Sequence, residues 1–372
     1  MSEWQNVALK QLVKFGNGKS RPKEKGKIPV YGGNGILDFT DKYNYVGNTL
    51  IIGRVGAYCG ATYLEKSPVW VSDNALSAKA LGNNNSNYLY YLFKYLDLNQ
   101  YAQGSSHPLL TQTLLNAIEV ETTLDCIEQK AIASVLSSLD NKIDLLHRQN
   151  KTLEAMAETL FRQWFVEEAQ DDWVEVKVSH FVTLNKSSIT KKYDHQNILY
   201  LDTSSLTKGY ISELKPLILS EAPSRAKRLV QHLDILISTV RPDQCHYGFC
   251  FKPEANLVVS TGFCTITCDT ITPYFIYYLL TSEDMTEYLH SIAEGSTSTY
   301  PSLKPEDIGN VLFALPPKEK LNDYHNVVGA MWNKINQNQK QIQTLENFRD
   351  TLLPKLMSGE VRVNYTPEEI KQ

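Results

Sequence analysis

The chain has 372 residues, of which 42% are hydrophobic and 21% charged, and its formal net charge is −4. That length is typical of two domains, and the composition excludes a disordered, collagen-like or membrane-spanning chain. The net charge gives no global sign of nucleic-acid binding, so a DNA partner would need local basic charge. The first ten residues lack the basic-then-apolar pattern of a secretory signal, and we therefore expect a cytoplasmic protein.

The first local basic charge lies near the start of the chain. Residues 10–27 hold seven Lys or Arg residues against one acid, Glu24, and their Gly, Asn and Ser content predicts a flexible loop able to follow phosphates. Gly-Lys-Ser at 18–20 resembles the end of a nucleotide-binding phosphate loop, but Val13 stands where that motif needs its first glycine. The alternative to a DNA-binding loop is a solvated basic face.

The first globular part reads as mixed α and β structure. Short β-rich runs such as 49–52 and 69–71 are separated by Gly, Asn and Pro signals, which predicts an α+β fold. Runs of the same kind recur in the second half, at 233–239, 257–260 and 265–267.

Two long helices follow the two globular parts. Heptad repeats begin at Ile132 and Val328 and continue over four heptads each, and Asn338 and Arg349 interrupt the second one. Apolar positions alternating three and four residues apart predict helices that pack on each other as a coiled coil. The predicted organisation is a globular domain at 1–126, a central helix at 127–166, a second globular domain at 172–315, a second helix at 317–357 and a tail at 358–372.

Polar residues in the heptads predict how the helices pair. Asn150 occupies an a position and Asn338 a d position, and these positions face each other in an antiparallel coiled coil. A parallel alignment would leave two buried amides without partners, each at a cost of about 1–3 kcal/mol. We therefore predict an antiparallel pair with the two domains at opposite ends of a rod. The neighbouring pairs would be Ile143 with Leu345, Leu146 with Ile342 and Leu153 with Ile335.

The chain contains one unit twice. Residues 141–161 match 333–353 at a constant offset of 192, and the polar segment 104–108 lies in the same place as 295–301. This self-similarity predicts a pseudo-two-fold internal repeat of globular domain and helix.

Over nearly its whole length, the chain resembles the specificity subunits of type I restriction-modification systems. The resemblance rests on the repeat, on the helices and on three local motifs. The motifs are LISTVRP at 236–242, VSTGF at 259–263 and LLPKLMSGEV at 352–361. The first half has Val-Gly at 55–56 and Ser-Asp-Asn at 72–74 in place of the Arg-Pro and Ser-Thr-Gly patterns.

The resemblance implies a non-catalytic subunit with two target-recognition domains, each reading one half of a split DNA sequence. Its expected partners are double-stranded DNA and modification (methyltransferase) subunits in two copies, with restriction subunits as an optional addition and no membrane. S-adenosylmethionine, ATP and Mg²⁺ are expected in the partner subunits, and no cofactor in this chain. The alternatives are a structural coiled-coil adaptor without DNA affinity and a self-contained DNA methyltransferase or nuclease.

Basic segments occur in both halves of the repeat, which favours DNA binding over a merely solvated basic face. We expect the bases to be read by side chains whose hydrogen-bond donors and acceptors match those at the base edges. The residues expected to contact DNA are Lys19, Arg21, Lys23, Lys25, Lys27, Asn34, Arg54, Ser105, Ser106 and His107 in the first half, and Lys191, Lys192, Arg225, Lys227, Arg228, Arg241, Ser296, Thr297, Thr299 and Tyr300 in the second.

Four of the six cysteines lie between Cys245 and Cys268, with His246 among them. Their spacings differ from the usual two-residue zinc knuckle, and an alternating strand would bury Cys264. We therefore predict no metal site.

Overall fold

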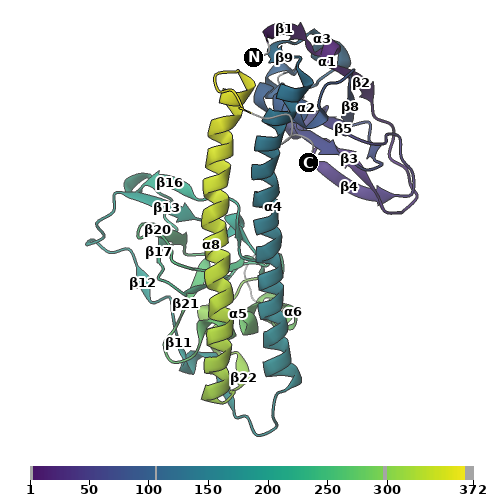
Figure 1. The fold of residues 1–372 in the computed structure, drawn as a ribbon. Coiled ribbons are helices and arrows are strands. Elements are labelled where there is room, and N and C mark those ends of the chain that lie inside the picture. Colours follow the sequence, from purple (N-terminus) through teal and green to yellow (C-terminus); the bar gives the residue numbers. More distant parts are fainter. Residues whose placement is uncertain (1–2, 105–106, 296–299, 365–372) are drawn as a thin grey trace. The chain divides into compact units, whose positions relative to one another are not determined.

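The computed structural model describes residues 3–104, 107–295 and 300–364 (Figure 1). The chain forms two compact units, which we call unit 1 (residues up to 146 and from 341 onward) and unit 2 (residues 147–340). The long helices α4 (Cys126–Arg162) and α8 (Lys318–Met357) each contribute one part to each unit. Within the described residues, no helix has the length and apolarity needed to cross a bilayer.

Unit 1 contains three small sheets and short helices beside its parts of α4 and α8. Its four-stranded sheet has the order β2-β8-β5-β6, and the others are β4-β3-β7 and β1-β9. The strands are β1 (Trp4–Ala8), β2 (Val13–Asn17), β3 (Ile28–Gly32), β4 (Gly35–Thr40), β5 (Thr49–Gly53), β6 (Thr62–Glu65), β7 (Trp70–Val71), β8 (Ala75–Ala80) and β9 (Glu119–Thr123). The helices are α1 (Leu9–Leu12), α2 (Ser86–Leu96) and α3 (Gln112–Ala117).

The central strand of unit 1, β5, is buried on both faces. Leu50 and Ile52 pack into the cluster that includes Leu89 of α2, whereas Ile51 points to the opposite face and packs with Val69 and Val71. Successive side chains of a strand point to opposite faces, so a run of apolar residues is compatible with a strand covered on both sides. This explains why the sequence shows an unbroken apolar run here.

Unit 2 contains the same arrangement with additional strands. Its four-stranded sheet is β11-β21-β18-β19, its five-stranded sheet is β12-β17-β20-β13-β16, and β10-β22 and β14-β15 form pairs. The strands are β10 (Glu175–Lys177), β11 (Val182–Leu184), β12 (Ser187–Ser188), β13 (Asn197–Leu201), β14 (Leu206–Thr207), β15 (Tyr210–Ile211), β16 (Lys215–Ile218), β17 (Ala226–Leu229), β18 (Ile235–Ser238), β19 (Tyr247–Phe249), β20 (Leu257–Ser260), β21 (Phe263–Cys268) and β22 (Leu312–Ala314). The helices are α5 (Pro273–Thr281), α6 (Glu283–Glu294) and α7 (Pro305–Gly309).

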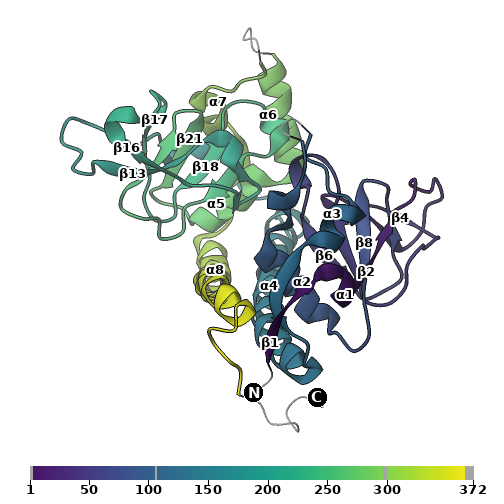
Figure 2. The same ribbon diagram turned by 90° about the horizontal axis from the view of Figure 1, so that it is seen from above.

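The two units share one topology, as the predicted repeat requires. The antiparallel order β2-β8-β5-β6 corresponds to β11-β21-β18-β19. In each unit a parallel pair lies in the adjoining sheet, β3 with β7 and β13 with β20. A helix packs on the four-stranded sheet in both, α2 in unit 1 and α5 in unit 2 (Figure 2). The predicted α+β fold with two β-rich domains is confirmed.

In unit 1, α4 and α8 pack antiparallel in the predicted register. Ile143, Leu146, Ile342 and Leu345 form one apolar cluster, as the heptads predict. Arg349, which interrupts the second heptad repeat, donates to the carboxylate of Asp140 of α4 at 2.9 Å, and Tyr91 of α2 donates to the same carboxylate at 2.7 Å.

In unit 2, the same helices meet at the predicted asparagine pair. Nδ2 of Asn338 donates to Oδ1 of Asn150 at 2.8 Å and to Oε1 of Gln149 at 2.9 Å. Beyond this layer the hydroxyl of Tyr324 donates to the backbone oxygen of Ala157 at 3.2 Å, in a core rich in aromatic rings. The antiparallel coiled coil is therefore present within each unit.

The segment after α8 returns to the beginning of the chain in unit 1. The guanidinium of Arg362 donates to the buried carboxylate of Glu128 at 2.6 Å and lies 4.9 Å from the centre of the Trp4 ring. Leu356 and Met357, at the end of α8, are buried in the unit 1 core. Residues 358–364, the described part of the tail, are thus a structural part of unit 1.

Candidate DNA-binding surfaces

In unit 1 a turn at 72–75, between β7 and β8, joins three of the predicted segments. The backbone N–H of Lys19 donates to Val71 at 3.0 Å, and that of Arg54 donates to Asn74 at 3.0 Å. Gly33, which precedes Asn34 in the β3–β4 turn, lies against the backbone of Asn74 and Gly53. The turn therefore brings Lys19, Asn34 and Arg54 to one end of the sheets.

The polar loop at 104–110 reaches the same end of unit 1. The N–H of Leu110 donates to the backbone oxygen of Arg54 at 2.9 Å, and the N–H of Gly56 donates to Pro108 at 3.3 Å. His107 is exposed beside this contact. The predicted contacts Ser105 and Ser106 lie outside the described residues.

The predicted loop at 10–27 is wrong in its first part, because residues 10–17 belong to α1 and β2, whereas residues 18–27 form a loop between β2 and β3. Trp70 donates to the backbone oxygen of Lys19 at 3.3 Å, and Gly26 packs directly on the backbone at 40–41. Lys25 forms an ion pair with Asp38 at 2.7 Å. The predicted contacts in this loop are all exposed, namely Lys19, Arg21, Lys23, Lys25 and Lys27.

In unit 2 the turn at 260–262 takes the place of the turn at 72–75. The N–H and the hydroxyl of Thr239 both donate to the backbone oxygen of Gly262, at 2.9 and 3.0 Å, and the N–H of Thr261 donates to Arg225 at 2.8 Å. The motif LISTVRP at 236–242 is thus hydrogen-bonded to the motif VSTGF at 259–263 through Thr239. Sequence reasoning missed this role, although the hydroxyl residues in both motifs are a signal for it.

Residues 300–303 lie at the same end of unit 2 as this turn. Leu303 donates from its N–H to the oxygen of Thr239 at 2.7 Å, and Arg241 donates from its N–H to Pro301 at 2.9 Å. The guanidinium carbon of Arg241 lies 4.7 Å from the centre of the Tyr300 ring. The predicted contacts Ser296, Thr297 and Thr299 lie outside the described residues.

The remaining predicted contacts of unit 2 lie along the edge of its five-stranded sheet. Ile189 donates to the backbone of Lys227 at 2.8 Å, which joins the segment with Lys191 and Lys192 to β17. Both of those lysines and Lys227 are exposed. Arg228 is partly buried, and its Nη1 donates to Ser188 at 3.5 Å, so it is less accessible than the others.

The matching hydrogen bonds fix which residues of the two units are equivalent. Arg54 corresponds to Thr239, because the N–H of each donates to the adjoining turn and the oxygen of each accepts from the N–H of a leucine. Pro108 corresponds to Pro301, because the oxygen of Pro108 accepts from the N–H of Gly56, two residues after Arg54, and that of Pro301 from the N–H of Arg241, two residues after Thr239. Of the polar segments 104–108 and 295–301, the described residues Pro108 and Pro301 thus make equivalent contacts.

The cysteines of unit 2 do not converge on one point. Cys250 packs in the cluster with Leu236, whereas Cys264 packs on the opposite face of the sheet with Ile235. Burial raises the pKa of Cys264 to about 12 and also raises that of Cys250, so both thiols remain protonated. Among the described residues, no group of three or more Cys, His, Asp or Glu side chains has the arrangement of a metal site.

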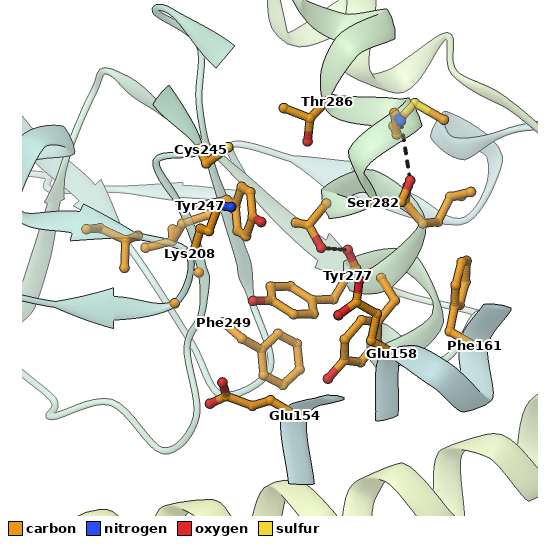
Figure 3. A pocket seen from close by; sticks show the side chains of 18 of the residues that line it. Glu154, Glu158, Phe161, Lys208, Cys245, Tyr247, Phe249, Tyr277, Ser282 and Thr286 are labelled. Atoms are coloured by element: carbon orange, nitrogen blue, oxygen red, sulfur yellow. Dashed lines mark hydrogen bonds between the residues drawn. The ribbon is translucent and has the colours of Figure 1, made fainter. Parts of the chain in front are cut away.

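Unit 2 also contains a cavity of about 1600 Å³ beside α4. Figure 3 shows Glu154 and Glu158 of α4 near Tyr277 and Phe249, with Lys208 and Cys245 across the opening. Burial raises the pKa of Glu154. Seven Asp or Glu residues line the cavity against three Lys or Arg, so its charge disfavours phosphate. The cavity is therefore not a DNA site.

Comparison with known proteins agrees with this architecture. The family model of the type I restriction modification DNA specificity domain matches residues 1–155. The MjaIX specificity subunit of Methanocaldococcus jannaschii is 27% identical over 351 residues, which cover 85% of this chain and 78% of the relative. The MjaVIII specificity subunit of the same organism is 22% identical and covers 97% of this chain and 93% of the relative.

Solved structures show the same fold. The S subunit of a type I restriction-modification system from M. genitalium superimposes with a TM-score of 0.66 at 18% identity, and the match covers 96% of both chains. The chain is thus similar, over most of its length, to the specificity (S) subunits of type I restriction-modification systems, and residues 1–155 match their DNA specificity domain. It is the non-catalytic component that recognises the DNA target.

Proposed function

We propose that this subunit reads a split double-stranded DNA target, with residues 1–126 contacting one half-site and residues 172–315 the other. The observation that carries the proposal is the duplicated end of the sheets. In each unit the same backbone hydrogen bonds join a turn, a strand end and a polar loop, and basic side chains surround them. Two equivalent surfaces of this kind fit two separate stretches of DNA.

Exposed lysines and arginines in these surfaces supply phosphate contacts, and polar side chains at the turns supply base contacts. The charge is local, which reconciles DNA binding with the net charge of −4. Among the described residues, His107, Asn34 and Arg54 are the candidates for base contacts in unit 1. Arg225 and Arg241 are the candidates in unit 2.

We further propose that two methyltransferase (modification) subunits dock on α4 and α8, and that restriction subunits join through them. Met156 of α4 and Phe348 of α8 are equivalent at the repeat offset of 192, and both side chains are exposed, at 47% and 55%. Large apolar side chains exposed at equivalent positions of a repeat fit two copies of one partner. These partners would bring S-adenosylmethionine, ATP and Mg²⁺, so this chain needs no cofactor of its own.

A domain exchange tests the split target. Residues 172–315 are replaced by the corresponding segment of a related subunit, and methylated adenines are mapped in DNA exposed to the assembled enzyme. We expect one half of the methylated sequence to change and the other to stay. Exchange of residues 1–126 is the matched experiment and should change the opposite half. A change of both halves in either chimera would contradict the proposal.

Charge substitutions test the docking of two partners. M156E and F348E should each lower the number of bound methyltransferase subunits from two to one, measured by native mass spectrometry of the complex. K151E, at an exposed position of α4, is the control and should keep both copies. Two bound copies in both M156E and F348E would exclude these side chains as docking sites.

A further inference from the structure

The strongest unassigned feature is a sharp corner after the central strand of unit 2. The chain leaves β18 at Ser238 and makes a short turn at Pro242–Gln244. The residues on either side of that turn, Arg241 and Cys245, have φ angles of +49° and +54°. These angles lie in the left-handed region, which side chains other than that of glycine rarely adopt.

Unit 1 forms the same corner with glycine at both positions. Gly56 and Gly60 have φ angles of +75° and +88° and lie four residues apart, as Arg241 and Cys245 do, although the short turn Gly56–Tyr58 begins at Gly56 itself. Gly56 donates to Pro108 as Arg241 donates to Pro301, so the two corners are equivalent. The fold therefore requires the left-handed backbone at this corner, and glycine satisfies it without strain.

The side chain of Arg241 is consequently not needed for the corner to form. A β-carbon placed on Gly56 would meet no atom within 4 Å, so a side chain at this position of the corner projects into open space. Strained residues persist where the surrounding structure holds them, and they concentrate at functional sites. Here the backbone of Arg241 is held by Pro301, and that of Thr239 by Gly262 and Leu303.

The guanidinium of Arg241 contacts the ring of Tyr300, and its side chain is exposed. It stacks over the ring of Tyr300 at 4.7 Å, a cation–π contact that leaves the edge of the guanidinium free. Among the described residues, no carboxylate pairs with it. The backbone of Arg225 accepts from the N–H of Thr261 in the adjoining turn at 260–262, and the side chain of Arg225 is exposed.

We propose that Arg241, positioned by Tyr300, reads a guanine in the half-site contacted by unit 2, and that unit 1, with Gly56 at the equivalent corner, makes no such contact. The inference rests on the proposed split target. A planar fork of donors matches O6 and N7 of guanine in the major groove. Flexible lysines are sufficient for phosphate, whereas a strained and stacked arginine gives the fixed direction that base recognition needs.

The test uses the full chain assembled with its modification subunits and a set of DNA duplexes in which each target position is substituted in turn. R241G installs the residue that unit 1 carries at this corner, so the backbone is relieved and the fold should be retained. We expect preference for guanine at one position of the unit 2 half-site to fall about 5- to 150-fold, with the other half-site unchanged. R241K keeps the charge and loses the fork, and it should show the same loss with an unchanged salt slope.

Uniform weakening on all duplexes, with a shallower salt slope, would show a phosphate contact and overturn the proposal. Unchanged specificity in R241G would overturn it as well. If the wild-type complex reads both half-sites and R241G keeps the full guanine preference in the unit 2 half-site, the inference fails while the proposed function stands. A wild-type complex that reads only one half-site would refute the proposed function instead.

Tyr300 is a positioning residue in this proposal. Y300F keeps the aromatic face and should retain the guanine preference. Y300L removes the face and should lower the preference while leaving overall affinity for DNA and the preference of the unit 1 half-site unchanged. Equal behaviour of Y300F and Y300L would show that the ring does not position Arg241.

Discussion

Asn150 and Asn338 face each other across the coiled coil, with Nδ2 of Asn338 2.8 Å from Oδ1 of Asn150. Both side chains are buried, and Leu153 and Ile335 lie in the apolar core of the same unit. A buried amide is satisfied only where the opposite helix supplies another polar group. The pair therefore specifies one antiparallel register, at a cost in stability relative to an apolar layer.

Replacement of one member of this pair should destabilise the protein. N338L leaves the buried amide of Asn150 without its partner, and we expect the free energy of unfolding to fall by about 1–3 kcal/mol, measured by chemical denaturation. The double variant N150L/N338L should recover most of that loss because neither amide is then buried. N347L, at an exposed position of α8, is the control and should change stability by less than about 0.5 kcal/mol. Additive losses in the double variant would contradict the pairing.

The register can also be trapped covalently. L146C/I342C places two thiols in the layer next to the asparagine pair, and mild oxidation should form a disulfide within the chain, detected as a mobility shift that a reductant reverses. L145C/I342C is the matched control, because Leu145 is 50% exposed and points away from this layer. A disulfide that forms equally well in both variants would count against the register.

The lysines of the basic loop should contribute unequally to DNA binding. Lys23 is exposed, and K23A should weaken binding to all sequences alike and reduce the slope of log K against log salt by about 0.9 for one lost phosphate contact. Lys25 is engaged by Asp38, so K25A should change the slope less. Equal slopes for wild type and K23A would show that the loop faces solvent.

The paired helices should act as a ruler for the target. Insertion of one heptad beside Asn150 in α4 and a matching heptad beside Asn338 in α8 preserves the asparagine pair and lengthens the coiled coil by about 10 Å, equivalent to at most about three base pairs. We expect the assembled variant to methylate the same two half-sites with a longer spacer. An insertion in α4 alone is the control and should abolish the paired register. A variant with both insertions that methylates only the original spacing would disprove the ruler.

The repeat, the two long helices and their register were predictable because heptad spacing and buried polar residues follow simple periodic rules. Arg349 was read only as an interruption, because its partner Asp140 lies on the other helix and no local pattern indicates the ion pair. The candidate surfaces were predicted in part. Motif similarity located the turn at 260–262, but its bonds to Thr239 depend on tertiary contacts. Composition alone predicted a loop over residues 10–27, whereas pairing of β2 with β8 places residues 13–17 in a sheet.

The tail contact between Arg362 and Glu128 has a consequence for the order of events during synthesis. Unit 2 is one continuous stretch of chain, whereas unit 1 needs residues from 341 onward for its core. Since chains are synthesised at about 5–20 residues per second, roughly 10–40 s pass between synthesis of residue 146 and synthesis of residue 341. The second half of the protein is therefore expected to fold before the first half is complete. A chain truncated after residue 340 should contain a protease-resistant unit 2 and a protease-sensitive segment at 1–146. Nascent chains on the ribosome should pass through the same state.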